Sequence, residues 1–215
     1  MPMADSPPYV QPVARERGPN HALSLPNLLT YARVVAVPLL VLCFYLEGNA
    51  SRWFSFAVFL IASISDFFDG YLARAWGQQS AIGQMLDPIA DKLLVATALM
   101  LLVWSGTIGD WSLLAALVIL IREISVSGLR EFLAGLKNVS VPVTRLAKWK
   151  TTMQMVAIGF LLIGPAGDRM FRFYFDGYGF FTYVGLLLLW VSALITLYTG
   201  YDYFRAGLRH LMEDG

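Results

Sequence analysis

The chain has 215 residues, of which 57% are hydrophobic and only 14% charged, and its mean hydropathy is +0.60. This composition is too apolar for an ordinary soluble domain and predicts a membrane protein with several spans. The formal net charge of +1 supplies no basic face of the kind that binds nucleic acid, so no nucleic-acid partner is expected. Cys43 is the only cysteine, which excludes an intramolecular disulfide and a cysteine-based metal site.

Six apolar segments follow a polar N-terminal region and predict an all-α integral membrane protein with six transmembrane helices. Their expected bounds are 28–46, 53–74, 89–104, 111–132, 151–163 and 177–201. Gly48 to Arg52 is expected to form a turn, and Pro88 to lie in the first turn of the third helix. The expected organisation is a flexible cytosolic tail over 1–22, a six-helix membrane domain over 23–207 and a short cytosolic tail over 208–215.

The distribution of Lys and Arg predicts the orientation, because positive charge in short loops is retained on the cytosolic side. With both termini in the cytosol, only Arg52, Arg169 and Arg172 of the 16 Lys and Arg residues fall on the opposite side. The same orientation places the end of the second helix and the start of the third helix at the cytosolic face. No internal repeat is visible, so an inverted-repeat transporter is not indicated.

Four aspartates lie beside or inside the second and third apolar segments, where an ionised carboxylate is costly unless a cation compensates it. Asp66 and Asp69 are three residues apart, and Asp87 and Asp91 are four apart, so each pair shares one face of its helix. Two facing pairs would form an oxygen cage with no His or Cys nearby, which favours Mg²⁺ or Mn²⁺. Because Mg²⁺ completes its coordination with phosphate oxygens, the pattern favours a phosphate-bearing substrate.

Small residues and one arginine accompany the aspartates. Gly70 and Ala73 would let a bulky group approach the helix backbone, and Arg74 can offer a fork to phosphate. One alternative is that the carboxylates only form salt bridges at the membrane surface, with Arg33, Arg74 and Lys92. Another is a cation or proton pathway of a transporter, which would explain the carboxylates but not the small residues or Arg74.

The spacing Asp66-x₂-Asp69-Gly70-x₂-Ala73-Arg74-x₈-Gly83-x₃-Asp87-x₃-Asp91 resembles the signature of the CDP-alcohol phosphotransferase family at all eight positions. The resemblance implies a six-helix membrane enzyme, usually a homodimer, with its active site at the cytosolic ends of the second and third helices. Such an enzyme uses two divalent cations, Mg²⁺ or Mn²⁺, to move a phosphatidyl or similar group from a CDP-linked donor to an alcohol, releasing CMP.

The resemblance also implies roles for individual residues. The metal ligands would be Asp66, Asp69, Asp87 and Asp91. Asp91 would in addition act as the base that deprotonates the attacking hydroxyl. The residues around the CDP moiety would be Gly70, Ala73, Arg74 and Gly83, with Asn27, Thr30 and Arg33 lining the nucleotide side.

The alcohol acceptor must be inferred from the rest of the chain. The segments LPNLLTYARVVAVP (25–38), IREISVSGLREFLA (121–134) and LAKWKTTMQM (146–155) look like those of bacterial phosphatidylglycerophosphate synthases. This implies CDP-diacylglycerol and sn-glycerol 3-phosphate as substrates, in the lipid of a bacterial inner membrane. The candidate cations for the acceptor phosphate are Arg122, Arg130, Lys148 and Lys150. The alternatives are another acceptor, such as inositol phosphate or serine, and headgroup or topology roles for these cations.

Overall fold

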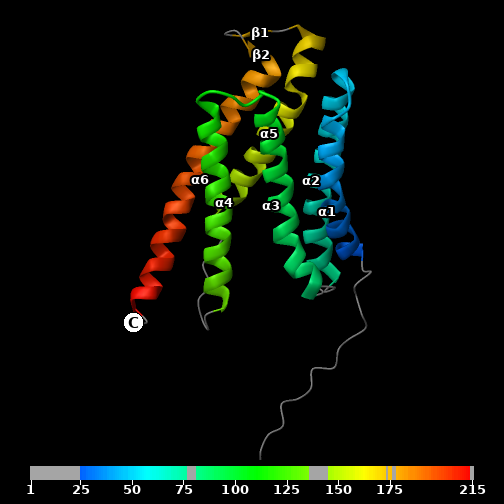
Figure 1. Cartoon of the computed structure of the whole chain (residues 1–215). Helices are drawn as coiled ribbons and strands as arrows, with labels where there is room; N and C mark the ends of the chain where they lie inside the picture. Colours follow the sequence, from blue (N-terminus) through cyan, green and yellow to red (C-terminus); the bar gives the residue numbers. More distant parts are fainter. Residues whose placement is uncertain (1–24, 77–80, 136–144, 173, 176–177, 214–215) are drawn as a thin grey trace, which may run out of the picture.

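The computed structural model describes residues 25–76, 81–135, 145–172, 174–175 and 178–213. Within these ranges the chain forms six long helices and one short hairpin (Figure 1). The helices are α1 Leu25–Phe44, α2 Gly48–Trp76, α3 Ala81–Trp104, α4 Ser112–Gly135, α5 Arg145–Phe171 and α6 Phe180–Glu213. The all-α architecture is therefore confirmed, and the expected N-terminal tail lies outside the described residues.

Several predicted helix bounds are wrong, mostly because the helices extend beyond their apolar segments. Two deviate the other way, since α1 already ends at Phe44 and α6 begins only at Phe180. Gly48 to Arg52 forms the first turn and a half of α2 rather than a connecting turn, with Gly48 alone at a positive φ of 73°. α3 begins at Ala81, so Pro88 lies inside that helix and not in its first turn. The Lys92 ammonium donates to the Pro88 carbonyl oxygen at 3.1 Å. Asp87 and Asp91 thus both lie well inside α3, on a continuous helical face.

The hairpin between α5 and α6 is an element that apolar patterning did not predict. Strand β1, Tyr174–Phe175, pairs antiparallel with β2, Tyr178–Gly179. Two residues per strand are too few for a detectable alternation of apolar and polar positions. In Figure 1 the hairpin lies at the top of the bundle, at the opposite end from the junction of α2 and α3.

The outer surface of the bundle is apolar and its interior is partly polar. Large hydrophobic side chains point outward all along the helices, including Val35, Leu42, Ile61, Met100 and Leu194. The fully buried side chains include the following polar or charged ones: Asn27, Thr30, Arg33, Ser55, Lys150, Gln154, Ser192 and Thr196. A soluble protein shows the reverse distribution, so this exterior is suited to contact with lipid.

Three helices are long and apolar enough to cross a membrane among the residues that the structure describes. They are α1 over Asn27–Phe44, α4 over Ser112–Leu129 and α6 over Phe180–Arg205. Each of these windows has 18 residues or more, which approaches the hydrocarbon thickness of a bilayer. The chain is therefore a membrane protein by the length and composition of its helices.

Helix packing brings α1 next to both α2 and α3, while α5 packs against α2 and α6, and α4 against α6. The apolar core lies between these helices and includes Leu99, Leu102, Ile158, Leu161 and Leu189. Because α2 ends and α3 begins at the same end of the bundle, their aspartate-bearing turns lie at that end, below the core in Figure 1. This arrangement lets α1 contribute side chains to the aspartates.

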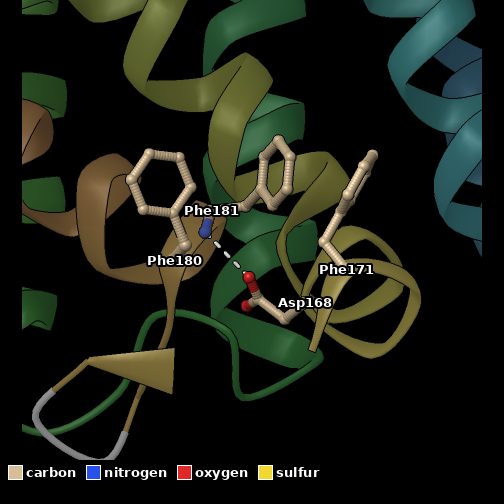
Figure 2. Close-up of a pocket in the computed structure, with 4 residues that line it drawn as sticks. All are labelled: Asp168, Phe171, Phe180 and Phe181. Carbon is tan, nitrogen blue, oxygen red and sulfur yellow. Dashed lines mark hydrogen bonds between the residues drawn. The ribbon is translucent and has the colours of Figure 1, made fainter. Parts of the chain in front are cut away.

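The buried carboxylate of Asp168 connects α5 to the start of α6 by hydrogen bonds (Figure 2). Asp168 accepts hydrogen bonds from the backbone N–H groups of Phe181 at 2.7 Å and Thr182 at 3.3 Å, and from the Thr182 hydroxyl at 2.5 Å. The first N–H groups of a helix have no partner within the helix, so this carboxylate satisfies them from a neighbouring element. With Phe171 and Phe180, it lines a cavity of about 310 Å³.

Adding one methyl group beside Asp168 is expected to destabilise the protein. A Cβ on Gly179 would lie 1.9 Å from Asp168 Cγ, which forces the backbone or the carboxylate to move. Gly179→Ala should lower the free energy of unfolding by about 1–3 kcal/mol, the usual cost of overpacking. Thermal unfolding of the detergent-solubilised protein measures the effect. Gly128→Ala is the matched control, because a Cβ there meets nothing within 4 Å; equal melting temperatures for the two variants would contradict the prediction.

Candidate active site

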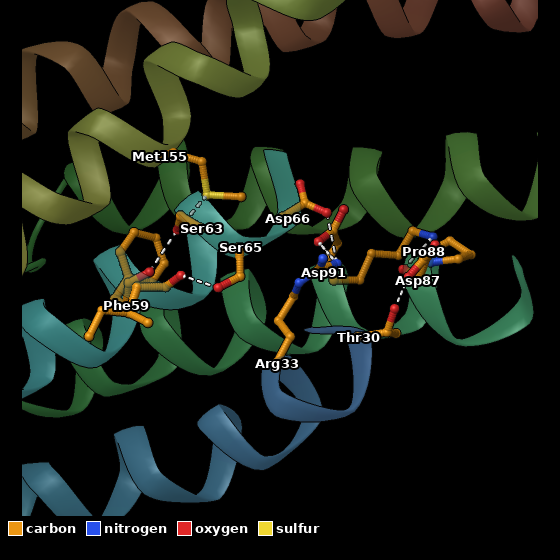
Figure 3. A network of polar contacts seen from close by, with 12 residues as sticks. Thr30, Arg33, Phe59, Ser63, Ser65, Asp66, Asp87, Pro88, Asp91 and Met155 are labelled. Atoms are coloured by element: carbon orange, nitrogen blue, oxygen red, sulfur yellow. Dashed lines mark hydrogen bonds and ion pairs between the residues drawn. The ribbon is translucent and has the colours of Figure 1, made fainter. Parts of the chain in front are cut away.

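One arginine joins the two aspartate-bearing helices (Figure 3). Arg33 Nη1 lies 2.8 Å from Asp66 Oδ1 on α2 and 2.8 Å from Asp91 Oδ1 on α3. The Arg33 side chain is fully buried, whereas the side chains of Asp66 and Asp91 are 35% and 40% exposed. A buried guanidinium is tolerated only with counter-charges, and these two carboxylates supply them. The carboxylates keep one side open to solvent and to a ligand.

A threonine of α1 holds the third described aspartate. The Thr30 hydroxyl donates to Asp87 Oδ1 at 2.5 Å, one turn of α1 before Arg33. Asn27, three residues earlier, is buried on the same helical face. The three residues predicted to line the nucleotide side are therefore brought to one face of α1, and two of them contact aspartates directly. The spacing of three residues was visible in the sequence, but the partners across the bundle were not.

Part of the predicted site cannot be placed. The side chains of the following residues lie outside the part of the chain that the structure describes: Asp69, Gly70, Ala73, Arg74, Arg130 and Lys148. Gly83 is described and buried, one turn before Asp87 on α3. The structure thus brings together Asp66, Asp87 and Asp91 with α1.

The described oxygens suit a hard divalent cation in chemistry, although they do not form a complete cage. Asp66 and Asp91 bracket a single positively charged nitrogen, and carboxylate oxygens are the ligands that Mg²⁺ and Mn²⁺ prefer. Among the described residues no three His, Cys, Asp or Glu side chains converge on one point. With Asp69 as a further ligand, the carboxylates of Asp66, Asp87 and Asp91 fit such an ion. Arg33 would then compete with the ion for the oxygens of Asp66 and Asp91.

A second charged cluster lies between α4, α5 and α6. Glu123 Oε1 pairs with the ammonium of Lys150, whose side chain is 2% exposed, and lies 3.4 Å from Arg122 Nη1. Arg122 Nη2 also donates to the Thr199 hydroxyl at 3.2 Å, and its guanidinium carbon lies 5.9 Å from the Tyr203 ring centroid. Glu123 is therefore a counter-charge for two of the predicted acceptor cations, Arg122 and Lys150.

The register of α5 against α2 brings this cluster level with the aspartates. The Ser63 hydroxyl lies 3.8 Å from Met155 Sδ, and a Cβ on Gly159 would lie 3.4 Å from Phe56. The two helices run antiparallel at 1.5 Å per residue, so Lys150, five residues before Met155, lies near the level of Asp66. The two charged clusters consequently occupy about the same depth of the bundle.

Neutralising Glu123 is expected to destabilise the bundle strongly. Glu123→Gln leaves the buried Lys150 ammonium without its carboxylate, and removing one partner of such a pair costs about 3–5 kcal/mol. We expect a clearly lower melting temperature in detergent, with partial recovery in the Glu123→Gln/Lys150→Met double variant. Glu131→Gln is the matched control, since Glu131 is exposed on the same helix. Equal melting temperatures for the two single variants would exclude the structural role of this pair.

Comparison with known proteins identifies the class of protein that this fold and site define. Residues 23–198 match the family model described as CDP-alcohol phosphatidyltransferase. The chain belongs to this family. It is a membrane protein, and it carries the aspartate signature by which the sequence resembled the family. Members of the family generally depend on divalent metals.

The curated relatives carry a more specific name. A protein of Cereibacter sphaeroides is 39% identical over 89% of this chain and 98% of its own length. A protein of Rickettsia bellii is 45% identical over 85% of this chain and 94% of its own length. A protein of Shigella flexneri is 40% identical over 89% of this chain and 98% of its own length. All three are named CDP-diacylglycerol–glycerol-3-phosphate 3-phosphatidyltransferase.

Proposed function

We propose that the chain transfers the phosphatidyl group of CDP-diacylglycerol to sn-glycerol 3-phosphate, forming phosphatidylglycerophosphate and CMP. The observation that carries this proposal is the joining of Asp66 and Asp91 by Arg33, level with the cations of α4 and α5. The matching names of relatives at 39% to 45% identity support the choice of substrates. The reaction is a phosphotransfer with no covalent enzyme intermediate.

The donor would bind at the aspartate end of the bundle. Its diphosphate would lie against Gly70, Ala73, Arg74 and Gly83, and its cytidine beside Asn27 and Thr30. Asp66, Asp69, Asp87 and Asp91 would hold two divalent cations, Mg²⁺ or Mn²⁺, which supply charge neutralisation of the diphosphate when bound. The acyl chains would remain in lipid, which contacts the apolar exterior of the helices.

Asp91 would act as the general base. Its carboxylate takes the proton of the acceptor hydroxyl, whose oxygen then attacks the phosphorus of the phosphatidyl group. A new P–O bond to glycerol forms while the bond to CMP breaks, and CMP leaves with the electron pair of that bond. Arg33 donates to Asp91 at 2.8 Å and so orients this carboxylate before the proton arrives.

The acceptor phosphate would be held by Arg122, Arg130, Lys148 and Lys150. Two of these, Arg122 and Lys150, already pair with Glu123, so a dianionic phosphate would have to share or displace that carboxylate. Lys150 lies level with Asp66, which puts its charge at the depth where the acceptor hydroxyl must reach the donor. The cluster supports a phosphorylated acceptor over serine, which carries no phosphate.

We also propose six membrane spans, with both termini and the aspartates on the cytosolic side of a bacterial inner membrane. The bias of Lys and Arg supports this orientation, since among the Lys and Arg residues of the described helices and connections only Arg52, Arg169 and Arg172 lie at the opposite end. A homodimer is the expected assembly. On this arrangement the soluble acceptor and the donor headgroup arrive at the same face.

An acceptor panel tests the proposal. Purified protein in mixed micelles receives CDP-diacylglycerol, Mg²⁺ or Mn²⁺ and one acceptor, and labelled lipid and CMP are measured together. We expect both products only with glycerol 3-phosphate. Equal turnover with inositol phosphate or serine would assign another acceptor, and ion flux in proteoliposomes without CMP release would assign a transporter.

Removing one acceptor cation tests the phosphate site. Arg130→Ala is expected to raise the Michaelis constant for glycerol 3-phosphate more than that for the lipid donor, because one charged contact to phosphate is lost. Steady-state kinetics with each substrate varied in turn measure the two effects. Arg205→Ala, which changes an exposed cation on α6, is the control. Equal effects on both Michaelis constants would give Arg130 a structural role instead.

A further inference from the structure

A half-buried arginine that forms no ion pair with any described residue lies at the hairpin end of the bundle, far from the aspartates. Arg52 stands in the second turn of α2, just before the apolar segment that begins at Trp53. Its guanidinium carbon lies 5.0 Å from the centre of the Phe44 ring, and its Nη1 is buried with no hydrogen-bond partner. Among the described residues Arg52 forms no ion pair. A guanidinium so placed has lost much of its hydration without a compensating anion.

A second guanidinium lies at the same level. Arg169 Nε donates to the Pro165 carbonyl oxygen at 2.8 Å, so this side chain folds back one turn along α5. The Phe56 ring on α2 lies beside Gly159 on α5. Counted from this contact toward the hairpin, Arg52 lies about one turn further along α2, and Pro165 lies between one and two turns further along α5. Burial first, and then the nearby Arg169 charge, lower the pKa of Arg52. The two arginines are therefore close enough to repel each other.

The neighbouring carboxylate on α5 does not relieve this repulsion. Asp168 directs both carboxylate oxygens at the start of α6, where they accept from Phe181 and Thr182. Two cations at a partly apolar site that form no ion pair with a described carboxylate are costly unless an anion from outside the chain joins them. A single anion with several oxygens can accept from both forks at once.

We propose that Arg52 and Arg169 bind the phosphate group of an anionic phospholipid in the leaflet at the hairpin end. The site lies at headgroup level: Tyr45 and Trp104, with ring centroids 6.1 Å apart, are both exposed at this end, as expected of an aromatic belt. Phe54, two residues beyond Arg52, is exposed to the hydrocarbon that would carry the acyl chains. The site is separate from the aspartates and needs no substrate.

Native mass spectrometry of the full-length protein tests the lipid site. The probes are phosphatidylglycerol and phosphatidylcholine, added separately to the delipidated protein in detergent. We expect retention of phosphatidylglycerol to fall about fivefold for each of Arg52→Gln and Arg169→Gln, since one arginine near an anionic surface contributes roughly 1 kcal/mol. Arg172→Gln, an exposed cation at the same end, is the matched control and should retain the lipid. Equal loss in all three variants, or equal retention of both lipids, would overturn the proposal.

A second measurement separates a lipid from free phosphate and guards against unfolding. Melting temperatures are recorded with phosphatidylglycerol vesicles and with inorganic phosphate alone, for the wild type and for Arg52→Lys, which keeps the charge but not the fork. We expect stabilisation by the vesicles that is smaller in Arg52→Lys, and no shift with millimolar phosphate. Stabilisation by phosphate alone would assign a soluble anion and overturn the lipid assignment.

Discussion

Asp91→Asn is expected to reduce kcat about 10²–10⁴-fold, the usual contribution of a positioned general base. The amide keeps the shape of the carboxylate and its neighbours, but it cannot accept the proton of the acceptor hydroxyl. Most of the oxygens around the donor remain, so binding of CDP-diacylglycerol should change little. Turnover is measured by CMP release, and donor binding by equilibrium titration of the detergent-solubilised protein.

Asp110→Asn is the matched control for this substitution. Asp110 is exposed in the connection between α3 and α4 and has a φ of 45°, a conformation that Asn also tolerates. Its turnover and donor affinity should equal those of the wild type. Near-normal turnover in Asp91→Asn would assign the base elsewhere, while a parallel loss of donor binding would make Asp91 a binding residue.

The aspartate signature was readable from the sequence because it is local. Asp66 and Asp69, like Asp87 and Asp91, follow the helical repeat, so their shared faces depend only on spacing along one helix. The apolar segments likewise predicted six helices, since lipid-facing residues dominate each segment. What spacing cannot give is the partner on another helix: Arg33 lies 33 residues from Asp66 and 58 from Asp91 along the chain.

The misplaced helix ends have a physical cause. Hydropathy marks where a helix meets lipid, but α3 is already helical through the polar residues before its apolar part, and α5 is helical through polar residues on both sides of its apolar part. The polar start of α3 carries Asp87, so the length missed by hydropathy includes one of the predicted metal ligands. The Glu123–Lys150 pair was hidden for a similar reason: its members lie 27 residues apart, across two helices and the connection between them.

The pairing with Arg33 bears on both interpretations of the aspartates. Salt bridges at the membrane surface were one alternative, and Asp66 and Asp91 do form them. The two carboxylates nevertheless remain 35% and 40% exposed, whereas their arginine is fully buried. A purely structural ion pair gains nothing from leaving its carboxylates open, but a site for a phosphate-bound cation requires it. The contacts of Arg33 with Asp66 and Asp91 thus fit a site in which a divalent cation can replace the guanidinium.

The Arg33→Met variant tests whether a divalent cation can replace the Arg33 guanidinium. Removing the buried cation takes from Asp66 and Asp91 the guanidinium that they share, which should lower the folding stability and reduce activity severely. If these carboxylates are also ligands of a divalent ion, Mg²⁺ or Mn²⁺ can replace the missing charge. The melting temperature of Arg33→Met should then rise with added divalent ion much more than that of the wild type.

The comparison needs a control for general effects of the ion. Arg205→Met removes an exposed cation from α6 and should respond to divalent ion as the wild type does. A parallel rise in all three proteins would mean that the ion acts elsewhere, and the aspartates would then be partners of Arg33 alone. A rise confined to Arg33→Met would assign Asp66 and Asp91 as metal ligands without reference to turnover, because the readout is stability. The same titration with Asp91→Asn added should abolish the effect, since one of the two carboxylates is then lost.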